Sequence, residues 1–223
     1  MDTVGFLVLA IYVAAPFLLL RFHRKWGPLA AVLALWLPIE FRLLTSTGVN
    51  PVTAIACGMV AGILAFRSRP DILDVSAAFN LRKLEFRTAF LNFAWFAAIG
   101  IPLGLAIGFI QPKVSLPNLG SLPTLLATIF FFNALPEEIL FRGILQHVIQ
   151  SALKSQVGGL ILGSIIFGLA HLNNGPDVPN YRYFVMATLA GVFYGRAWQR
   201  KGNVLTSALT HTLVNTGWRV FFR

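Results

Sequence analysis

Long apolar stretches separated by short polar or basic segments make up most of this chain. A helix needs about 20 apolar residues to cross the hydrocarbon layer of a membrane. Seven ranges reach or approach that length, namely 3–20, 52–66, 88–110, 123–148, 157–172, 183–198 and 204–220. An eighth range, 26–44, is weaker because Pro38, Glu40 and Arg42 interrupt it. The pattern predicts an all-α, polytopic transmembrane helix bundle of about eight spans.

The basic residues favour eight spans over seven, because with eight they alternate correctly between the two sides of the membrane. With the N-terminus outside, the inner side receives Arg21, Arg24 and Lys25, then the basic residues of 67–87, then Lys154, and finally Arg196, Arg200 and Lys201. An excess of Lys and Arg marks the cytoplasmic side of membrane proteins. Between two spans, residues 70–87 mix apolar and charged positions at helical spacing, which predicts a helix lying at the inner interface.

Composition agrees with a membrane domain. Apolar residues make up 57% of the chain and charged residues only 12%, roughly half the charged fraction of a soluble domain. A formal charge of +10 would suggest nucleic acid in a soluble protein, but here the basic residues lie between apolar stretches and form no basic face. We therefore expect the lipid bilayer as a partner, no nucleic acid, and a single transmembrane domain over residues 1–223.

Ionisable side chains inside the predicted spans are the best candidates for a functional site. A charged residue at the centre of a bilayer costs about 2.5–3.5 kcal/mol on insertion scales, so such residues are rarely kept without a function. The last four spans contain Glu137, Glu138, Arg142, His147, His171 and His211, with Asn133 and Asn215 beside them. The first four spans contain little that is comparable. This clustering predicts one buried polar cavity in the half that covers residues 120–220.

The segment 133–143, NALPEEILFRG, contains two adjacent acidic residues and a basic one. Glu138 and Arg142 are four residues apart, so they share a helix face and can form an ion pair. Glu137 points about 100° away from Glu138 on a regular helix. One carboxylate can thus be neutralised by Arg142 while the other faces a cavity. The simpler interpretation, an ion pair that only holds helices together, remains open for this segment alone.

Two further segments place polar groups on single helix faces. In 167–171, FGLAH, Phe167 and His171 lie one turn apart. In 211–215, HTLVN, His211 and Asn215 are four residues apart and share a face. Each of these could be a satisfied structural group when taken separately. Convergence of three helices on one cavity explains all of them together.

Such a set of groups suits peptide hydrolysis, which needs an activated water, a proton donor for the leaving amine and a stabiliser of the oxyanion. A glutamate in a cavity of low dielectric can act as a general base. We assign this role to Glu137, with His171 sharing the attacking water and moving its proton. His211 and Asn215 can donate hydrogen bonds to the oxyanion.

Other chemistries have weaker support. Ser164 and Ser207 lie in spans without the signature of a serine nucleophile, and the aspartates fall in termini or loops. The HExxH zinc motif is absent, yet two histidines and a glutamate could bind zinc, so a zinc-dependent protease using the same residues stays open. A non-catalytic membrane protein of the bacteriocin-immunity type is the second alternative. A proton-coupled transporter is the third, although the polar residues fall in one half of the chain.

The three segments together resemble the motifs of a known family. EEILFRG at 137–143, FGLAH at 167–171 and HTLVN at 211–215 are similar to the motifs EExxxR, FxxxH and HxxxN of the CAAX protease and bacteriocin-processing family, in the same order. The resemblance covers the C-terminal half, while the first four spans share only their hydrophobicity. It implies an eight-helix membrane fold with a catalytic cavity inside the bilayer, and an intramembrane endopeptidase of the glutamate type.

The resemblance also implies a role for each matching residue. Those that it assigns to catalysis are Glu137, His171, His211 and Asn215, and those that it assigns to support are Glu138, Arg142 and Phe167. In this family the glutamate and the first histidine activate water, while the second histidine and the asparagine stabilise the oxyanion. No cofactor is implied, and zinc remains the open alternative named above.

The substrate is not determined by these residues. Eukaryotic relatives remove the last three residues of prenylated CAAX proteins, whereas many prokaryotic relatives are linked to bacteriocin maturation or self-immunity. The compact chain resembles the prokaryotic members, which argues against a CAAX substrate. We therefore expect a multi-pass protein of a prokaryotic cell membrane that cleaves a membrane-anchored peptide or protein.

Overall fold

The computed structural model describes residues 2–22, 26–113, 119–175 and 178–223, and within these ranges the fold is all-α with no strand. The all-α prediction is therefore confirmed. Arg24 and Lys25, which the sequence pattern places on the inner side, lie outside the described residues. An isolated antiparallel bridge joins Pro112 to Phe222.

Each of the eight predicted ranges coincides with a helix in the described part of the chain. The N-terminal helices are α1 (Thr3–Phe22), α2 (Gly27–Glu40), α3 (Pro51–Phe66) and α5 (Phe86–Ala106), with the short α4 (Val75–Ala78) between the last two. The C-terminal helices are α6 (Leu122–Ile129), α7 (Leu135–Glu138), α8 (His147–Leu153), α9 (Gln156–Leu169), α10 (Tyr181–Gln199) and α11 (Val204–Phe221). Three 3-10 turns cover Thr45–Thr47, Leu81–Lys83 and Leu119–Ser121.

Helices α6, α7 and α8 form one continuous helix, because π-helical turns at Phe130–Ala134 and Ile139–Gln146 join them. We call this element the α6–α8 helix. Pro136 has no N–H to offer the carbonyl of Phe132, which favours the wider turn just before the two glutamates. Such π-turns occur frequently at functional sites.

Among the described residues, three helices are long and apolar enough to cross a membrane by length and composition: Thr3–Phe22, Phe86–Ala106 and Leu122–Leu153. Gly27–Glu40, Pro51–Phe66 and Gln156–Leu169 are apolar but shorter. The chain is thus an integral membrane protein of several helices. The count of eight spans stays a prediction.

Asparagine and serine side chains mark where several helices begin. Asn50 accepts hydrogen bonds from the backbone N–H groups of the first turn of α3, which starts with Pro51. Ser155, Asn180 and Asn203 cap α9, α10 and α11 in the same way. Each cap satisfies backbone donors that have no partner inside the helix. These caps set where the motif-bearing helices start.

The predicted interface helix over 70–87 is wrong. Before α5 begins at Phe86, the structure has only the four-residue α4 and one 3-10 turn there. Asp74 and Asn80 accept hydrogen bonds from nearby backbone N–H groups, and such local bonds compete with a continuous helix. Asn203 Nδ2 also donates to the carbonyls of Ala77 and Asn80, which ties this connector to the start of α11.

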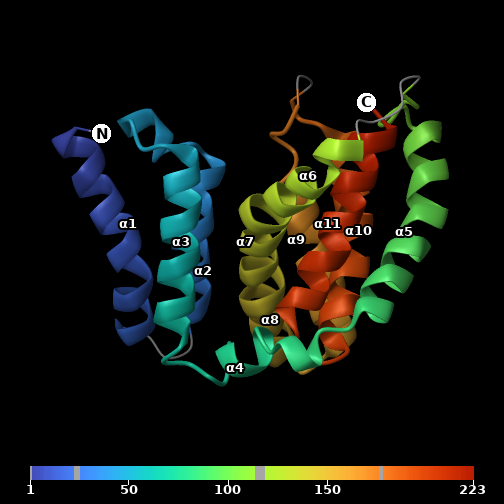
Figure 1. The fold of residues 1–223 in the computed structure, drawn as a ribbon. Helices are drawn as coiled ribbons and strands as arrows, with labels where there is room; N and C mark the ends of the chain where they lie inside the picture. Colours follow the sequence, from blue (N-terminus) through green and yellow to red (C-terminus); the bar gives the residue numbers. More distant parts are fainter. Residues whose placement is uncertain (1, 23–25, 114–118, 176–177) are drawn as a thin grey trace.

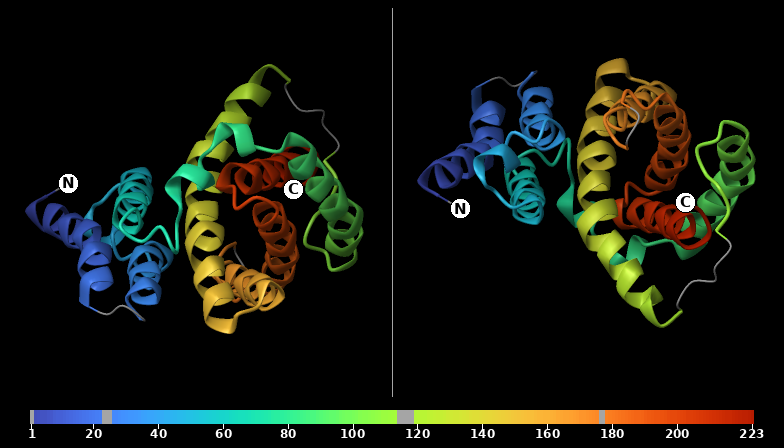
Figure 2. Two further views of the ribbon diagram at one scale, coloured as in Figure 1. Left: turned by 90° about the horizontal axis from the view of Figure 1, so that it is seen from below. Right: turned by 90° about the horizontal axis from the view of Figure 1, so that it is seen from above.

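Successive long helices run in opposite directions, so the ends of α1, α3, α8 and α10 lie at the same end of the bundle as α4 (Figure 1). The α6–α8 helix stands between the group α1–α3 and the group formed by α9, α10, α11 and α5 (Figure 2). Close packing of α9 on α10 depends on small residues. A Cβ on Gly168 would lie 2.0 Å from Thr188 Oγ1, and one on Gly191 would lie 3.1 Å from the Ser164 Cα.

Candidate active site

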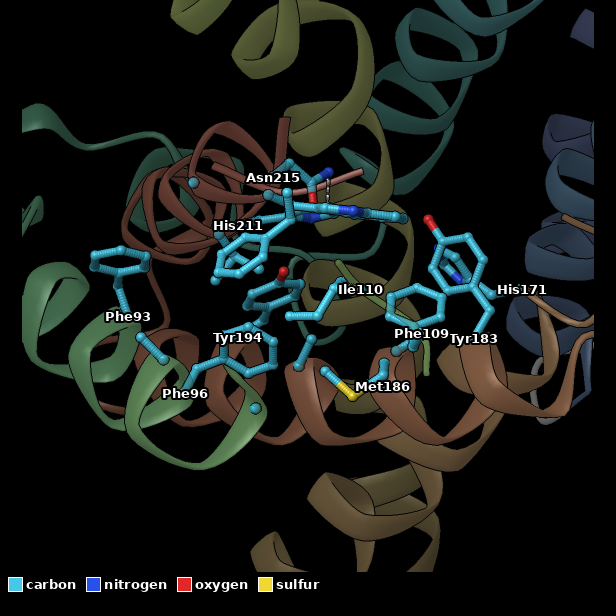
Figure 3. A pocket seen from close by; sticks show the side chains of 18 of the residues that line it. Phe93, Phe96, Phe109, Ile110, His171, Tyr183, Met186, Tyr194, His211 and Asn215 are labelled. Atoms are coloured by element: carbon cyan, nitrogen blue, oxygen red, sulfur yellow. Dashed lines mark hydrogen bonds between the residues drawn. The ribbon is translucent and has the colours of Figure 1, made fainter. Parts of the chain in front are cut away.

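The polar residues of the motifs meet at a cavity of about 310 Å³ inside the C-terminal group of helices. Its walls come from α5, α9, α10, α11 and the α6–α8 helix, and they are mostly aromatic and aliphatic. Figure 3 shows His211 and Asn215 on one wall, Tyr183 and His171 side by side at one end, and Phe93 and Phe96 at the other end. We call this space the first cavity.

Glu137 faces the first cavity from the α6–α8 helix. Its Oε1 accepts a hydrogen bond of 2.5 Å from Asn133 Nδ2, one turn earlier on the same helix. Its Oε2 is shielded from solvent and accepts no hydrogen bond from any described residue. The carboxylate is therefore held at one oxygen and keeps acceptor capacity at the other.

A chain of hydrogen bonds connects Glu137 to the third motif. Asn133 Oδ1 accepts a bond of 2.7 Å from Asn215 Nδ2. The same Asn215 Nδ2 lies 3.0 Å from His211 Nε2. Both N–H groups of Asn215 are thus directed at partners within the protein.

His211 reaches back to the second glutamate of the first motif. Its Nδ1 lies 2.9 Å from Glu138 Oε1. A carboxylate only accepts, so Nδ1 carries the proton, and Nε2 accepts from Asn215 in the neutral form of the ring. The ring of His211 also stacks on Tyr194, with centroids 4.4 Å apart and planes 14° apart.

Glu138 is fully buried, and three groups surround its carboxylate. Arg142 Nε lies 3.1 Å from Oε2, which confirms the predicted ion pair. Ser207 Oγ donates a bond of 2.5 Å to Oε2 and lies 2.9 Å from the Tyr194 carbonyl. With His211 on Oε1, both oxygens of the Glu138 carboxylate have a partner.

Arg142 is fully buried, and its guanidinium contacts rings as well as the carboxylate. Its central carbon lies 4.5 Å from the centroid of Phe167 and 5.7 Å from that of Tyr194. None of its nitrogens is aligned for a hydrogen bond with a described residue. Cation–π contact with Phe167 therefore complements the ion pair.

His171 lies in the turn directly after α9, at the edge of the first cavity. Its Nδ1 lies 2.7 Å from the Phe167 carbonyl, so Nδ1 carries the proton and Nε2 is the acceptor in the neutral ring. Its ring packs against Phe167 at 4.6 Å and Tyr183 at 4.8 Å between centroids. Glu137 and His171 line the same cavity without a hydrogen bond to each other.

A second cavity of about 190 Å³ lies between α2 and α3 on one side and the α6–α8 helix on the other. Glu137 and His171 line it as well, together with Asn133 and Asn174. These groups therefore stand between the two cavities.

The structure brings together Glu137, His171, His211 and Asn215, with Glu138, Arg142 and Phe167 behind them. It does not bring His147 there, since that ring packs against Trp198. Sequence reasoning gave Asn133 no role, although its position four residues before Glu137 could have indicated the contact. Tyr183, Tyr194 and Ser207 carried no comparable signal.

Among the described residues, no three His, Cys, Asp or Glu side chains are grouped so that they could hold a metal ion.

Fold and site define a helical membrane protein with a polar cluster of glutamate, histidine and asparagine at an apolar cavity. Residues 119–217 match the family model described as "Rce1-like: Type II CAAX prenyl endopeptidase Rce1-like". This match contains all three motifs and confirms the resemblance to the CAAX protease and bacteriocin-processing family. By that description, the matched model represents CAAX prenyl endopeptidases. No curated protein and no solved structure matches the chain.

Proposed function

We propose that this protein hydrolyses a peptide bond of a membrane-embedded or membrane-proximal substrate, with Glu137 and His171 activating the attacking water. The observation that carries the proposal is that Glu137 and His171 line the same cavity, while Glu137 Oε2 accepts no hydrogen bond from any described residue. Asn133 holds the other oxygen of this carboxylate. A base must be oriented and still have a free acceptor, and Glu137 meets both conditions.

The chemistry follows from these contacts. Water donates one hydrogen bond to the Glu137 carboxylate and the other to His171 Nε2, whose ring is oriented by the Phe167 carbonyl. Its oxygen attacks the carbonyl carbon of the substrate while a proton passes to Glu137. The C–N bond of the tetrahedral intermediate then breaks, and Glu137 returns the proton to the leaving amine. The products are a carboxylate and a free amine.

Stabilisation of the oxyanion involves the third motif. In the neutral form of His211, the two N–H groups of Asn215 are directed at Asn133 and at His211 Nε2. When His211 is protonated, its Nε2–H no longer accepts from Asn215. Both groups can then donate to the oxyanion, which is a role for preorganised donors.

Cleavage by purified protein in liposomes tests the proposal, with an extracted membrane fraction as substrate and mass spectrometry of new peptide termini as the readout. Wild-type protein should produce new termini that Glu137→Ala and His171→Ala do not. Asp71→Ala, which removes an exposed acidic residue between α3 and α4, is the matched control and should cleave like wild type. Cleavage by Glu137→Ala at the wild-type rate would refute the mechanism.

A chelator series in the same assay separates this mechanism from the zinc-dependent alternative. Glutamate-based hydrolysis should continue in the presence of 1,10-phenanthroline. Loss of cleavage that added zinc restores would instead support a metalloprotease.

A further inference from the structure

Glu40 is an acidic residue outside the three motifs that lies on the same cavity as the proposed catalytic pair. It ends α2, and it lines the second cavity together with Glu137 and His171. In the sequence it is an interruption of the weakest span. Folding brings it to the α6–α8 helix, because α2 packs against that helix.

The hydrogen bonds of Glu40 do not satisfy its carboxylate. Trp36 Nε1 donates to Oε2 at 3.3 Å, and Asn173 Nδ2 donates to Oε1 at 3.5 Å. Both distances exceed those of good hydrogen bonds, and an ionised carboxylate can accept about four. Among the described residues, no Lys, Arg or His lies within ion-pair distance of Glu40. A half-buried carboxylate with only neutral donors favours a cation as its ligand.

The walls of the second cavity suit the rest of a basic side chain. Leu35, Ile39 and Met59 line it beside Glu40. Lysine and arginine carry long apolar stems that pack on such surfaces while the charged group reaches a polar partner. A small cation would leave these apolar walls without contact.

We propose that Glu40 binds a lysine or arginine side chain of the substrate in the second cavity, and that this contact determines which peptides are cleaved. The inference rests on the proposed function, because it places the cleaved bond at Glu137 and His171, between the two cavities. The basic residue then lies on the side of the cleaved bond that enters the second cavity, and the rest of the substrate lies in the first.

Charge-matched peptides test the inference. A membrane-anchored peptide that the wild-type protein cleaves is varied to Lys, Gln or Glu at each position flanking the cut. At positions on one side of the cut, Lys should raise kcat/KM at least about tenfold over Gln. Glu40→Gln keeps the shape and should reduce this ratio to about one. Glu40→Lys should reverse the preference toward the Glu peptide, and Asp71→Asn should keep the wild-type ratio.

Binding to a protein without the catalytic base separates this inference from the proposed function. This test does not require cleavage: fluorescence anisotropy compares a membrane-anchored peptide that contains Lys with its Gln counterpart. Glu137→Gln should bind the Lys peptide more tightly, and Glu137→Gln/Glu40→Gln should bind the two peptides equally. If the Lys peptide binds more tightly than the Gln peptide but the wild-type protein cleaves neither, the proposed function is rejected and the Glu40 site is retained. Equal binding of the two peptides, or a Lys preference that survives Glu40→Gln, would overturn the inference.

Discussion

His211 Nδ1 lies 2.9 Å from Glu138 Oε1, which joins the third motif to the first across 73 positions of sequence. Adjacent glutamates therefore have separate surroundings: Glu138 is enclosed by Arg142, Ser207 and His211, whereas Glu137 faces the cavities. We propose that the enclosed carboxylate of Glu138 positions the site and that the carboxylate of Glu137 reacts. This division is the basis of the following predictions.

Arg142→Met should destabilise the protein by about 3–5 kcal/mol, because Glu138 would keep a buried charge without its cation. Thermal unfolding in detergent measures the loss. The double variant Arg142→Met/Glu138→Gln should lose less stability than the sum of the losses in the two single variants, because it no longer contains the unpaired buried charge of Glu138. Additive losses would show that the pair does not act as a unit.

Ser207→Ala should lower stability by about 1–3 kcal/mol, because Glu138 loses a hydrogen bond inside the bundle. Proteolysis should continue at a rate within about tenfold of wild type, as expected of a residue that acts only through Glu138. Rates of peptide cleavage and unfolding midpoints measure the two effects. Complete loss of cleavage in a folded Ser207→Ala protein would point to a serine nucleophile instead.

Asn215→Ala should reduce kcat by about 10²–10³ with little change in KM, since its amide is proposed to act on the oxyanion. Steady-state kinetics on one membrane-anchored peptide measure both constants. Asn133→Ala provides the comparison, because it frees Glu137 Oε1 and leaves the contact between Asn215 and His211. A rise in KM with unchanged kcat in Asn215→Ala would contradict the oxyanion role.

Stability should fall in acid because of Glu85, which lies before α5 and outside the membrane-spanning helices. A hydrogen bond from Lys201, followed by one from Thr88 and the charge of Arg200, lowers the pKa of Glu85 below its usual 4.5. A lowered pKa in the folded state means that the stabilisation is complete above pH 4.5 and is lost as the pH falls through the folded value.

Unfolding midpoints of wild type and Glu85→Gln should therefore converge as the pH falls below 4.5. At neutral pH, high salt should reduce the difference between the unfolding midpoints of wild type and Glu85→Gln, because Arg200 and Lys201 pair with Glu85 near the surface. A gap that stays constant over the whole pH range would exclude this linkage.

Several features of the site could be predicted from local spacing. Glu138 with Arg142, and His211 with Asn215, are each four residues apart on one helix, and both contacts are present. Other features depend on neighbours that spacing does not reveal. The predicted helix over 70–87 fails because Asp74 and Asn203 bond the backbone there. The sequence predicts that His211 and Asn215 donate hydrogen bonds to the oxyanion. In the structure, His211 Nδ1 already donates to Glu138 and Asn215 Nδ2 already donates to Asn133.

The sequence by itself determined the all-α membrane fold, the helices that carry the polar groups and the resemblance to a family of membrane proteases, because apolar length and spacings of three to four residues are local properties of a chain. The tertiary structure decided which groups meet. It connected Glu137 to α11 through Asn133, connected Glu138 to α11 through His211, and brought Glu40 from α2 to the second cavity. Such contacts depend on how helices pack around one another, and that packing is set by side chains far apart in the chain.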